Sequence, residues 1–404
     1  EDSEQHDAAQ EFLFDILWRR ASDVDVLVGQ DKVRAVYRID GVDAERKDVL
    51  GVEDAERVLL YCKRLGGLNP DEIRRPQKGA LFASLLGDAG SLGKIEIVTS
   101  GSTMGERLRL KVEQSAGHKP LDELGMAKGR VESVRKLIEA PKGLLLLSGL
   151  KGSGVTTTQY AILRSHDAFM KNIHLLQRNA LYELDNITQV KHESTEKDVS
   201  YGRHLQSVLR REPDIVGIGE CEDRETAQIA LRAAAADRKI YMAIEGKSCF
   251  DALARLISLA EDPELVGSAI IGVINQKLIR VLCSSCRQSF KPDASLLRKV
   301  NIPPDKVEHF HRPPTEPVFD RKGREIVCQT CQGSGYVGRA GVFEVMVADS
   351  AIRKLISESA PIKQIRDRAR KNRMYYMQEE GLRKVIDGTT SLDEIIRGLR
   401  VDGK

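Results

Sequence analysis

The feature that most constrains the fold of this chain is a glycine-rich turn that follows four consecutive leucines. Leu144 to Leu147 predict a buried central strand, and the sequence Gly149-Leu-Lys-Gly-Ser-Gly-Val-Thr156 follows it directly. The residues from Thr156 to Arg164 then predict a helix. Strand, glycine-rich turn and helix is the context in which the pattern G-x-x-x-x-G-K-[ST] forms a phosphate-binding loop. We therefore expect a parallel α/β sheet built around this turn.

The turn departs from that pattern at one position, because Val155 stands where the pattern has lysine. Backbone N–H groups of such a loop and of the helix N-terminus hold phosphate oxygens, and the lysine adds a cation. The predicted nucleotide-binding residues are Gly149, Lys151, Gly152, Ser153, Gly154, Thr156 and Thr157. Lys151 is an alternative source of the cation, because an ammonium on a flexible stem acts as a point charge. A tight strand–helix turn without a ligand is the other interpretation.

Periodicity divides the rest of the chain into two kinds of domain. The residues from Ala8 to Arg20 predict an amphipathic helix. A small α+β domain follows, with strands expected at 24–28, 33–39, 94–98 and 107–112 and a helix at 55–65. Beyond a linker at 115–120, helices alternate with apolar strands at 143–148, 173–176, 214–218 and 240–244. That alternation is typical of a parallel sheet covered on both faces. The tail after Ala348 predicts helices, with breaks near Pro361 and at 388–391.

The charge and the hydropathy pattern exclude several classes of protein. A net charge of +3 over 404 residues gives no argument for a nucleic-acid partner. The basic stretch from Arg366 to Arg373 predicts a solvated helix face, and acidic residues interleave with it. No apolar run approaches the ~18 residues of a membrane span, and the acidic start carries no secretory signal. These features predict a cytoplasmic protein, and the absence of an initial methionine suggests that an upstream segment is missing.

Two C-x-x-C pairs, separated by 41 residues, predict a metal site. Their members are Cys283, Cys286, Cys328 and Cys331. Two such turns complete a tetrahedral set of four thiolates, which selects zinc and leaves no position for a substrate. The sequence therefore predicts structural zinc, with unmetallated thiols or labile disulfides as alternatives. Cys62, Cys221 and Cys249 have no comparable spacing and are expected in the core.

Further segments occur together in the order and spacing of one known family. They are Ala21–Asp23, Val33–Gly41, Arg75–Gln77, Gly105–Arg107, Tyr182–Leu184, Glu212–Glu220, Glu225–Ala230 and Gly335–Glu344. With the glycine-rich turn, they resemble the type II secretion and type IV pilus assembly ATPases, and the resemblance covers nearly the whole chain. It implies a RecA-like P-loop core, an N-terminal PAS-like α+β domain, a tetracysteine zinc module and a helical C-terminal part.

The resemblance also implies a domain division and a set of partners. The expected segments are an N-terminal helix (1–20), the α+β domain (21–116), the RecA-like core (117–282), the zinc module (283–334) and a C-terminal hairpin with helices (335–404). The family implies ATP with magnesium as the ligand and a cytoplasmic hexameric ring under the inner membrane. We expect a homo-hexamer or a mixed ring with an active paralogue. Platform proteins would provide the only link to the membrane.

The departures from the family fall on its catalytic positions. Glu220 keeps the Walker B position, and Thr156 keeps the hydroxyl of the loop. Gln177 and Arg178 stand where the family has a Glu-Asp pair whose glutamate activates the attacking water, and Glu245 replaces a histidine that senses the γ-phosphate. A glutamine cannot accept a proton from water as a carboxylate does.

Three family arginines are also replaced, namely those at Ala80, Glu96 and Glu222. Arginines of this kind contribute roughly 10³–10⁵ in rate. The sequence therefore predicts a pseudo-ATPase with a structural or regulatory role in a secretion-motor ring. The alternative is an active motor that draws its cation from Lys151 or Arg178. Other interpretations remain open: Glu220 can simply cap the end of a strand, and Glu222 and Glu245 can lie on solvated faces and not in the site.

Overall fold

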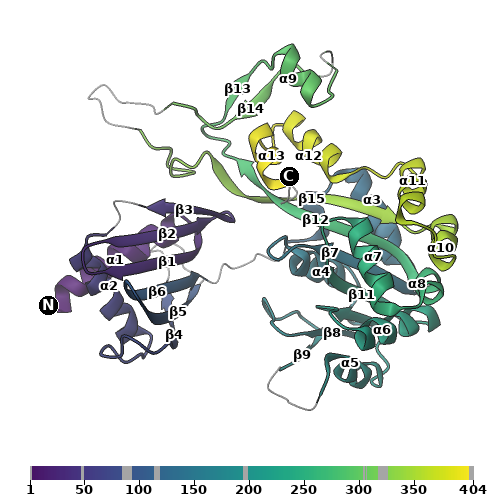
Figure 1. Cartoon of the computed structure of the whole chain (residues 1–404), viewed down its shortest axis with the longest axis horizontal. Helices are drawn as coiled ribbons and strands as arrows, with labels where there is room; N and C mark the ends of the chain where they lie inside the picture. Colours follow the sequence, from purple (N-terminus) through teal and green to yellow (C-terminus); the bar gives the residue numbers. More distant parts are fainter. Residues whose placement is uncertain are drawn as a thin grey trace. The chain divides into compact units, whose positions relative to one another are not determined.

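The structure is a computed structural model that describes residues 2–46, 50–83, 93–112, 119–193, 199–303, 305, 307–316 and 326–399. It divides into two compact units (Figure 1). The first unit comprises Glu1–Gly117 with Pro317–Gly338, and the second comprises His118–Glu316 with Arg339–Lys404. Most of the linker expected at 115–120 lies outside the described residues.

The first unit contains, within its described part, a six-stranded antiparallel sheet in the order β3-β2-β1-β6-β5-β4. Its elements are α1 (Asp2–Trp18), β1 (Ala21–Gly29), β2 (Val33–Ile39), β3 (Val42–Arg46), α2 (Val52–Leu65), β4 (Gln77–Ala83), β5 (Gly93–Ser102) and β6 (Gly105–Val112). Every second residue of β1, namely Val24, Val26 and Val28, is buried in one core with α1 and α2. The alternation places both helices on the same face of the sheet.

The helices and strands expected in this unit are confirmed, but β3 and β4 were not predicted. β3 is an edge strand whose residues are all at least partly exposed, so it carries no apolar alternation. β4 contains Gly79, which normally weakens a strand. A Cβ at that position would lie 2.3 Å from the carbonyl oxygen of Gly66, so the close backbone approach requires glycine.

The second unit contains a seven-stranded sheet in the order β15-β12-β7-β11-β10-β8-β9. Its first elements are η1 (Leu121–Glu123), α3 (Lys128–Glu139), β7 (Gly143–Gly149), α4 (Val155–Arg164), β8 (Ile173–Gln177), β9 (Thr188–Lys191), α5 (Tyr201–Leu209), β10 (Ile215–Ile218), α6 (Arg224–Ala236), β11 (Lys239–Glu245), α7 (Cys249–Ala260), α8 (Pro263–Ala269) and β12 (Ile270–Leu282). The strands from β12 to β9 pair in parallel. The predicted α/β fold is thereby confirmed.

The leucine run is continuous because helices cover both faces of this sheet. Leu144 and Leu146 lie in a core with α5, α6, α7 and α8, whereas Leu145 and Leu147 lie in a second core with α3 and α4. All four side chains are at most 1% exposed. A strand buried on both faces has no polar alternation, and the sequence shows this pattern.

The remaining elements follow β12. They are β13 (Gln288–Phe290), α9 (Ala294–Lys299), β14 (Phe310–Arg312), β15 (Tyr336–Val347), α10 (Ser350–Ser357), α11 (Ile362–Lys371), α12 (Met377–Ile386) and α13 (Leu392–Leu399). The expected helix breaks near Pro361 and at 388–391 are present, and a further break at 372–376 was not predicted. Residues 335–344, expected in the C-terminal hairpin, lie largely in β15, which pairs with β12.

No helix in the described parts of the chain is both long enough and apolar enough to cross a membrane.

A buried carboxylate attaches the last helix, α13, to β12. The Glu394 side chain is fully buried, and it accepts hydrogen bonds from the Arg280 backbone N–H at 2.9 Å and from the Arg280 guanidinium at 2.7 Å. Arg397 donates a further bond from Nε at 2.8 Å. Burial alone raises the pKa of Glu394, but the bonds from Arg397 and Arg280 outweigh it and hold the pKa below its usual value.

We expect Glu394→Ala to lower the free energy of unfolding by about 3 kcal/mol, because it leaves two guanidiniums without their carboxylate. Urea denaturation measures the loss, and Glu358→Ala, which removes an exposed pair with Lys354, should cost below about 1 kcal/mol. Because the folded pKa is depressed, the contribution is complete above the unfolded pKa of about 4.3 and is lost as pH falls through the folded pKa. Equal losses in both variants, or a difference that grows in acid, would contradict this assignment.

Candidate nucleotide site and cysteine cluster

The candidate nucleotide site lies where the parallel strands of the second unit end. β7 ends at Gly149, β8 at Gln177, β10 at Ile218 and β11 at Glu245. The register of β7 and β11 places Glu245 directly opposite Gly149. Ligands of an open parallel sheet usually bind at the carboxyl ends of its strands. The predicted site residues of the core therefore share one edge of the sheet.

The glycine-rich turn forms a backbone cradle at this edge. Gly152 and Gly154 have φ of +82° and +86°, in the left-handed region that favours glycine. A Cβ on Gly149 would lie 2.1 Å from Ser153 Oγ. Ser153 is 7% exposed, and its Oγ has no hydrogen-bond partner among the described residues. Gln276 Nε2 of β12 donates to the Ser153 carbonyl at 2.8 Å, which fixes the cradle to the sheet.

The cradle holds no cation at the position of the pattern's lysine. Val155 is the first residue of α4, is partly buried and packs against the core beneath that helix. Thr156 and Thr157 are also partly buried. Lys151 is exposed, and its ammonium forms no ion pair with any residue that the structure describes. The backbone part of the predicted site is thus present, while an apolar side chain occupies the cationic position.

An arginine occupies the acidic corner beside the cradle. Glu220 follows β10 and Arg178 follows β8, and Arg178 Nε lies 3.1 Å from Glu220 Oε1. The same guanidinium lies 3.4 Å from Glu222 Oε2, and its Cζ lies 5.9 Å from the centroid of the Tyr201 ring. Burial raises the pKa of Glu220, and the charge of Arg178 partly offsets this effect. Arg178 therefore lies against the carboxylates, not in the cradle.

Gln177 is turned toward the core. It is 4% exposed, and its Oε1 accepts a hydrogen bond from the Tyr160 hydroxyl at 2.8 Å. A glutamine in this arrangement supports the packing of α4 on β8. It offers no carboxylate at the place where the family resemblance puts the general base.

Three other positions at which this chain departs from the family lie at the end of β11 and in the sheet of the first unit. Glu245 is 59% exposed and lies 3.7 Å from Arg255. In the first unit, Ala80 of β4 lies directly opposite Glu96 of β5 in the antiparallel register. The two positions that the resemblance assigns to arginines are therefore neighbours on one sheet, and neither supplies a positive charge. Lys94 lies 3.9 Å from Glu96.

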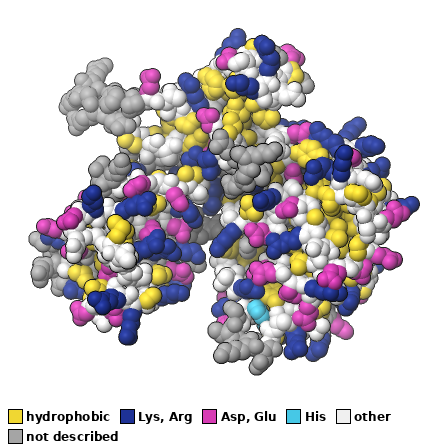
Figure 2. Space-filling view, viewed as in Figure 1, with side chains coloured by type: hydrophobic (Ala, Val, Ile, Leu, Met, Phe, Trp, Pro, Cys, Tyr) yellow, Lys and Arg dark blue, Asp and Glu magenta, His cyan; other side chains and the backbone are white. Residues whose placement is uncertain are grey.

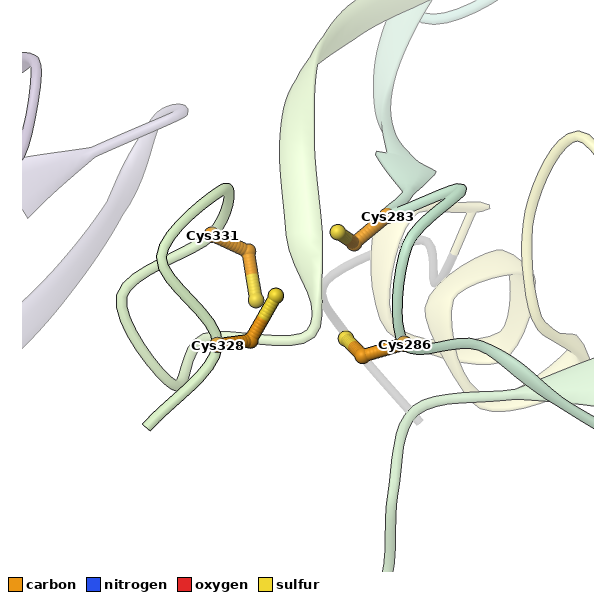
Figure 3. Close-up of side chains that lie close together, drawn as sticks. All are labelled: Cys283, Cys286, Cys328 and Cys331. Carbon is orange, nitrogen blue, oxygen red and sulfur yellow. The ribbon is translucent and has the colours of Figure 1, made fainter. Parts of the chain in front are cut away.

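The two C-x-x-C pairs come together in space, as predicted. All four sulfur atoms lie within 4.8 Å of one another. Figure 3 shows Cys283 and Cys286 on the loop after β12, and Cys328 and Cys331 on the loop before β15, with their side chains pointing toward one another. Cys283 and Cys331 are buried, whereas Cys286 and Cys328 are partly exposed. A metal ion fits this cluster of sulfur ligands.

The other cysteines lie in the core, as expected. Cys62 and Cys249 are fully buried, and Cys221 is 2% exposed. Burial raises the pKa of Cys62 and of Cys221 to about 12, so both thiols stay protonated at neutral pH.

Two residues that shape the site were not predicted. Gln276 holds the cradle, and Asn275 donates from Nδ2 to Ser148 Oγ at 3.1 Å and to the Gly246 carbonyl at 2.9 Å. Both residues are buried on β12, far from the cradle in sequence. Two adjacent amides that follow an apolar run, Ile270–Ile274, are the sequence signal that points to them.

Comparison with known proteins agrees with the fold described above. A family described as Type II/IV secretion system protein matches residues 3–397. Type II secretion system protein E of Pseudomonas aeruginosa is 30% identical over 391 residues, which are 96% of this chain and 74% of that protein. The type IV pilus assembly ATPase PilB of Thermus thermophilus is 29% identical over 395 residues, or 96% of this chain and 43% of PilB. The X-ray structure of the Legionella pneumophila ATPase DotB superposes with a TM-score of 0.64 at 14% identity, covering 96% and 93% of the two chains.

Proposed function

Because the chain belongs to the type II/IV secretion system protein family, we propose that it is a catalytically impaired, pseudo-ATPase subunit of a secretion or pilus-assembly motor. The family and the RecA-like fold predicted from the sequence are both confirmed. The side chains at the carboxyl edge of the sheet support this role within the family.

The observation that carries the proposal is the ion pair between Arg178 and Glu220. In P-loop enzymes, a carboxylate at the Walker B position, which Glu220 occupies here, holds the magnesium ion of the nucleotide. Here a guanidinium lies 3.1 Å from Glu220 and bridges to Glu222. Two like unit charges at about 4 Å repel by roughly 4 kcal/mol at an effective dielectric of 20, and magnesium carries two. Arg178 therefore opposes the binding of the metal that phosphoryl transfer requires.

Residual nucleotide binding is compatible with this proposal. The N–H groups of the cradle, together with Thr156 and Thr157, would hold phosphate oxygens. Without a lysine at Val155, one charge-assisted contact is missing, which weakens binding about ten- to a hundredfold. Gln177 provides no base for the attacking water. Bound ATP would therefore persist without being cleaved.

We expect purified protein with saturating magnesium-ATP to release phosphate no faster than buffer alone. Glu220→Gln should release it at the same rate, because no turnover depends on that carboxylate. Type II secretion system protein E of Pseudomonas aeruginosa, assayed in parallel, is the comparison protein. Steady turnover by the unmodified chain that disappears in Glu220→Gln would overturn the proposal.

The alternative is an active motor that takes its cation from Lys151 or Arg178. Arg178 does not favour it, because two carboxylates engage its guanidinium. Lys151 is exposed and makes no ion pair with a described residue, but a cation there would not replace the base that is missing at Gln177.

We propose zinc as the metal of the cysteine cluster, in a structural role. With Zn–S bonds of about 2.3 Å, the sulfurs of a tetrahedral site lie about 3.8 Å apart. Sulfurs that already lie within 4.8 Å of one another need to move little to reach this spacing. Four thiolates fill the coordination sphere, so the site would stabilise the fold and bind no substrate.

The proposed setting is a cytoplasmic hexameric ring, either of this chain alone or mixed with an active paralogue. The ring would act with inner-membrane platform proteins and would reach the membrane only through them, without nucleic acid. A mixed ring suits a subunit that keeps its fold but not its catalytic side chains. Native mass spectrometry of the complex isolated from its own cells would measure the subunit ratio.

A further inference from the structure

Helices α3, α11 and α12 of the second unit, with the turn after α11, carry a group of cations that form no ion pair with a described carboxylate, although Glu379 and Glu380 lie near enough to act on the charge of Arg130. Six of them, from four places in the chain, are Arg130 of α3, Lys363, Arg366 and Lys371 of α11, Arg373 of the following turn, and Arg383 of α12. All are exposed except Arg130, which is partly buried. Across the described residues, none of the six has a carboxylate oxygen within 4.0 Å. In the space-filling view, Lys and Arg side chains gather over α10 and α11 (Figure 2).

Tyr375 holds two of these cations in place. The Cζ of Arg130 lies 4.5 Å from the centroid of its ring, and that of Arg383 lies 4.3 Å from it. Arg130 also donates from Nη2 to the Arg373 carbonyl at 3.4 Å. Stacking on an aromatic ring orients a guanidinium but leaves its N–H edges free to donate. The guanidiniums of Arg130 and Arg383 are thus oriented to donate hydrogen bonds before any ligand binds.

We propose that this arginine–tyrosine surface, the six cations and Tyr375, binds an acidic segment of a partner protein. Two guanidiniums on one ring repel each other. Glu380 and Glu379 offset part of this charge, and a ligand carboxylate that bridges the outer edges of the guanidiniums relieves more of the repulsion. Arginine also matches carboxylates in a two-bond geometry that lysine cannot offer. The neighbouring cations extend the surface along α11, so a peptide with several acidic residues fits it better than a single anion.

The observations favour a protein segment over a lipid surface. A helix that binds a membrane exposes an apolar face beside its cations. The apolar residues of α11 face the opposite way, because Ile365 and Ala369 are at most 1% exposed and pack in the core. Along α11 the surface therefore presents charge without an apolar wedge, and on α12 Ile386 is the one large apolar side chain that is exposed.

A nucleic acid fits less well, because its phosphates form an unbroken series of negative charges. Asp367 and Glu379 lie among the cations, and Glu379 pairs with Arg370 at 2.6 Å. A peptide can place a neutral residue opposite these carboxylates, whereas a phosphate backbone cannot. The mixture of positive and negative side chains on this surface thus favours an acidic peptide over a nucleic acid.

Fluorescence anisotropy tests the proposal with the full chain and a labelled peptide of about 16 residues rich in Glu and Asp. The matched neutral peptide carries Gln and Asn at the same positions. We expect the acidic peptide to bind at about 50 mM NaCl, more weakly at about 200 mM, and the neutral peptide not to bind. Arg130→Gln with Arg383→Gln should weaken binding at least tenfold. Tyr375→Leu, which keeps both charges, should weaken it about threefold or more.

Arg298→Gln with Lys299→Gln is the matched control, since it removes the same charge from an exposed face of α9. This control should change the affinity less than about twofold. Equal weakening in the control, failure of the acidic peptide to bind at low salt, or tighter binding to phosphatidylglycerol vesicles or duplex DNA would each overturn the proposal. Thermal melting verifies folding. If the Arg130 and Arg383 variant does not fold, Lys371→Gln with Arg373→Gln replaces it under the same criteria.

Discussion

Cys283→Ser is expected to abolish zinc binding and to loosen the segment between β12 and β15. The unmodified chain should contain one zinc per molecule by metal analysis, and the variant should contain none at equal protein concentration. A closed site of four thiolates loses its geometry when one ligand is a hydroxyl. Structural sites bind zinc with apparent free energies of about 10–16 kcal/mol. We therefore expect this substitution to cost more binding free energy than any other single substitution in this protein.

Hydrogen exchange locates the effect. β13 and β14 form a small two-stranded sheet between the two cysteine pairs, and such a sheet is marginal without support. Their amides should exchange much faster in Cys283→Ser, and a chelator should reproduce the change in the unmodified protein. Cys221→Ser is the control, because Cys221 lies in the core of the sheet and not in the cluster. A full zinc content in Cys283→Ser would refute the assignment of this residue as a ligand.

The second large effect is expected at the cradle, where Val155→Lys should raise the affinity for ATP about ten- to a hundredfold. The substitution places a cation at the start of α4, beside N–H groups that the turn already holds in position. Phosphate release should nevertheless remain at background, because Arg178 still contacts Glu220 and Gln177 is still turned toward Tyr160. Calorimetry measures the affinity, and a phosphate assay measures turnover.

Two further variants make this result specific. Val155→Met adds length without charge and should leave ATP affinity within about threefold of the unmodified protein. Lys151→Ala should also have little effect, since Lys151 is exposed. A large loss of affinity in Lys151→Ala, with no gain in Val155→Lys, would show that the exposed lysine is the phosphate ligand.

The elements that form from local pattern were predictable from the sequence. Four adjacent leucines identified β7, and the glycines that follow identified the turn, because each constraint lies within a few residues. The cysteine spacing likewise identified the cluster. β3 and β4 were not predictable in this way. Their residues are held by pairing with neighbouring strands, and Gly79 is required by a contact with Gly66.

The ion pairs of the site were not predictable from local sequence, because they depend on which strands are neighbours in the sheet. Arg178 and Glu220 are 42 positions apart, and only the parallel pairing of β8 with β10 brings the ends of their strands together. The sequence left Arg178 as a candidate ligand for phosphate, whereas in the structure it neutralises acidic side chains. The stacking of Arg130 and Arg383 on Tyr375 has the same origin, since three separate segments contribute to it.

Strand β12 links three regions that would otherwise be independent. Gln276 holds the cradle, Arg280 holds the last helix through Glu394, and the next residue after the strand is Cys283. A strand within a sheet is stiff along its length, so a force applied at the sulfur cluster or at the final helix is transmitted to the turn as a small axial displacement. If the proposed function holds, this strand would transmit motions of neighbouring subunits to the cradle of a subunit that cleaves no nucleotide itself.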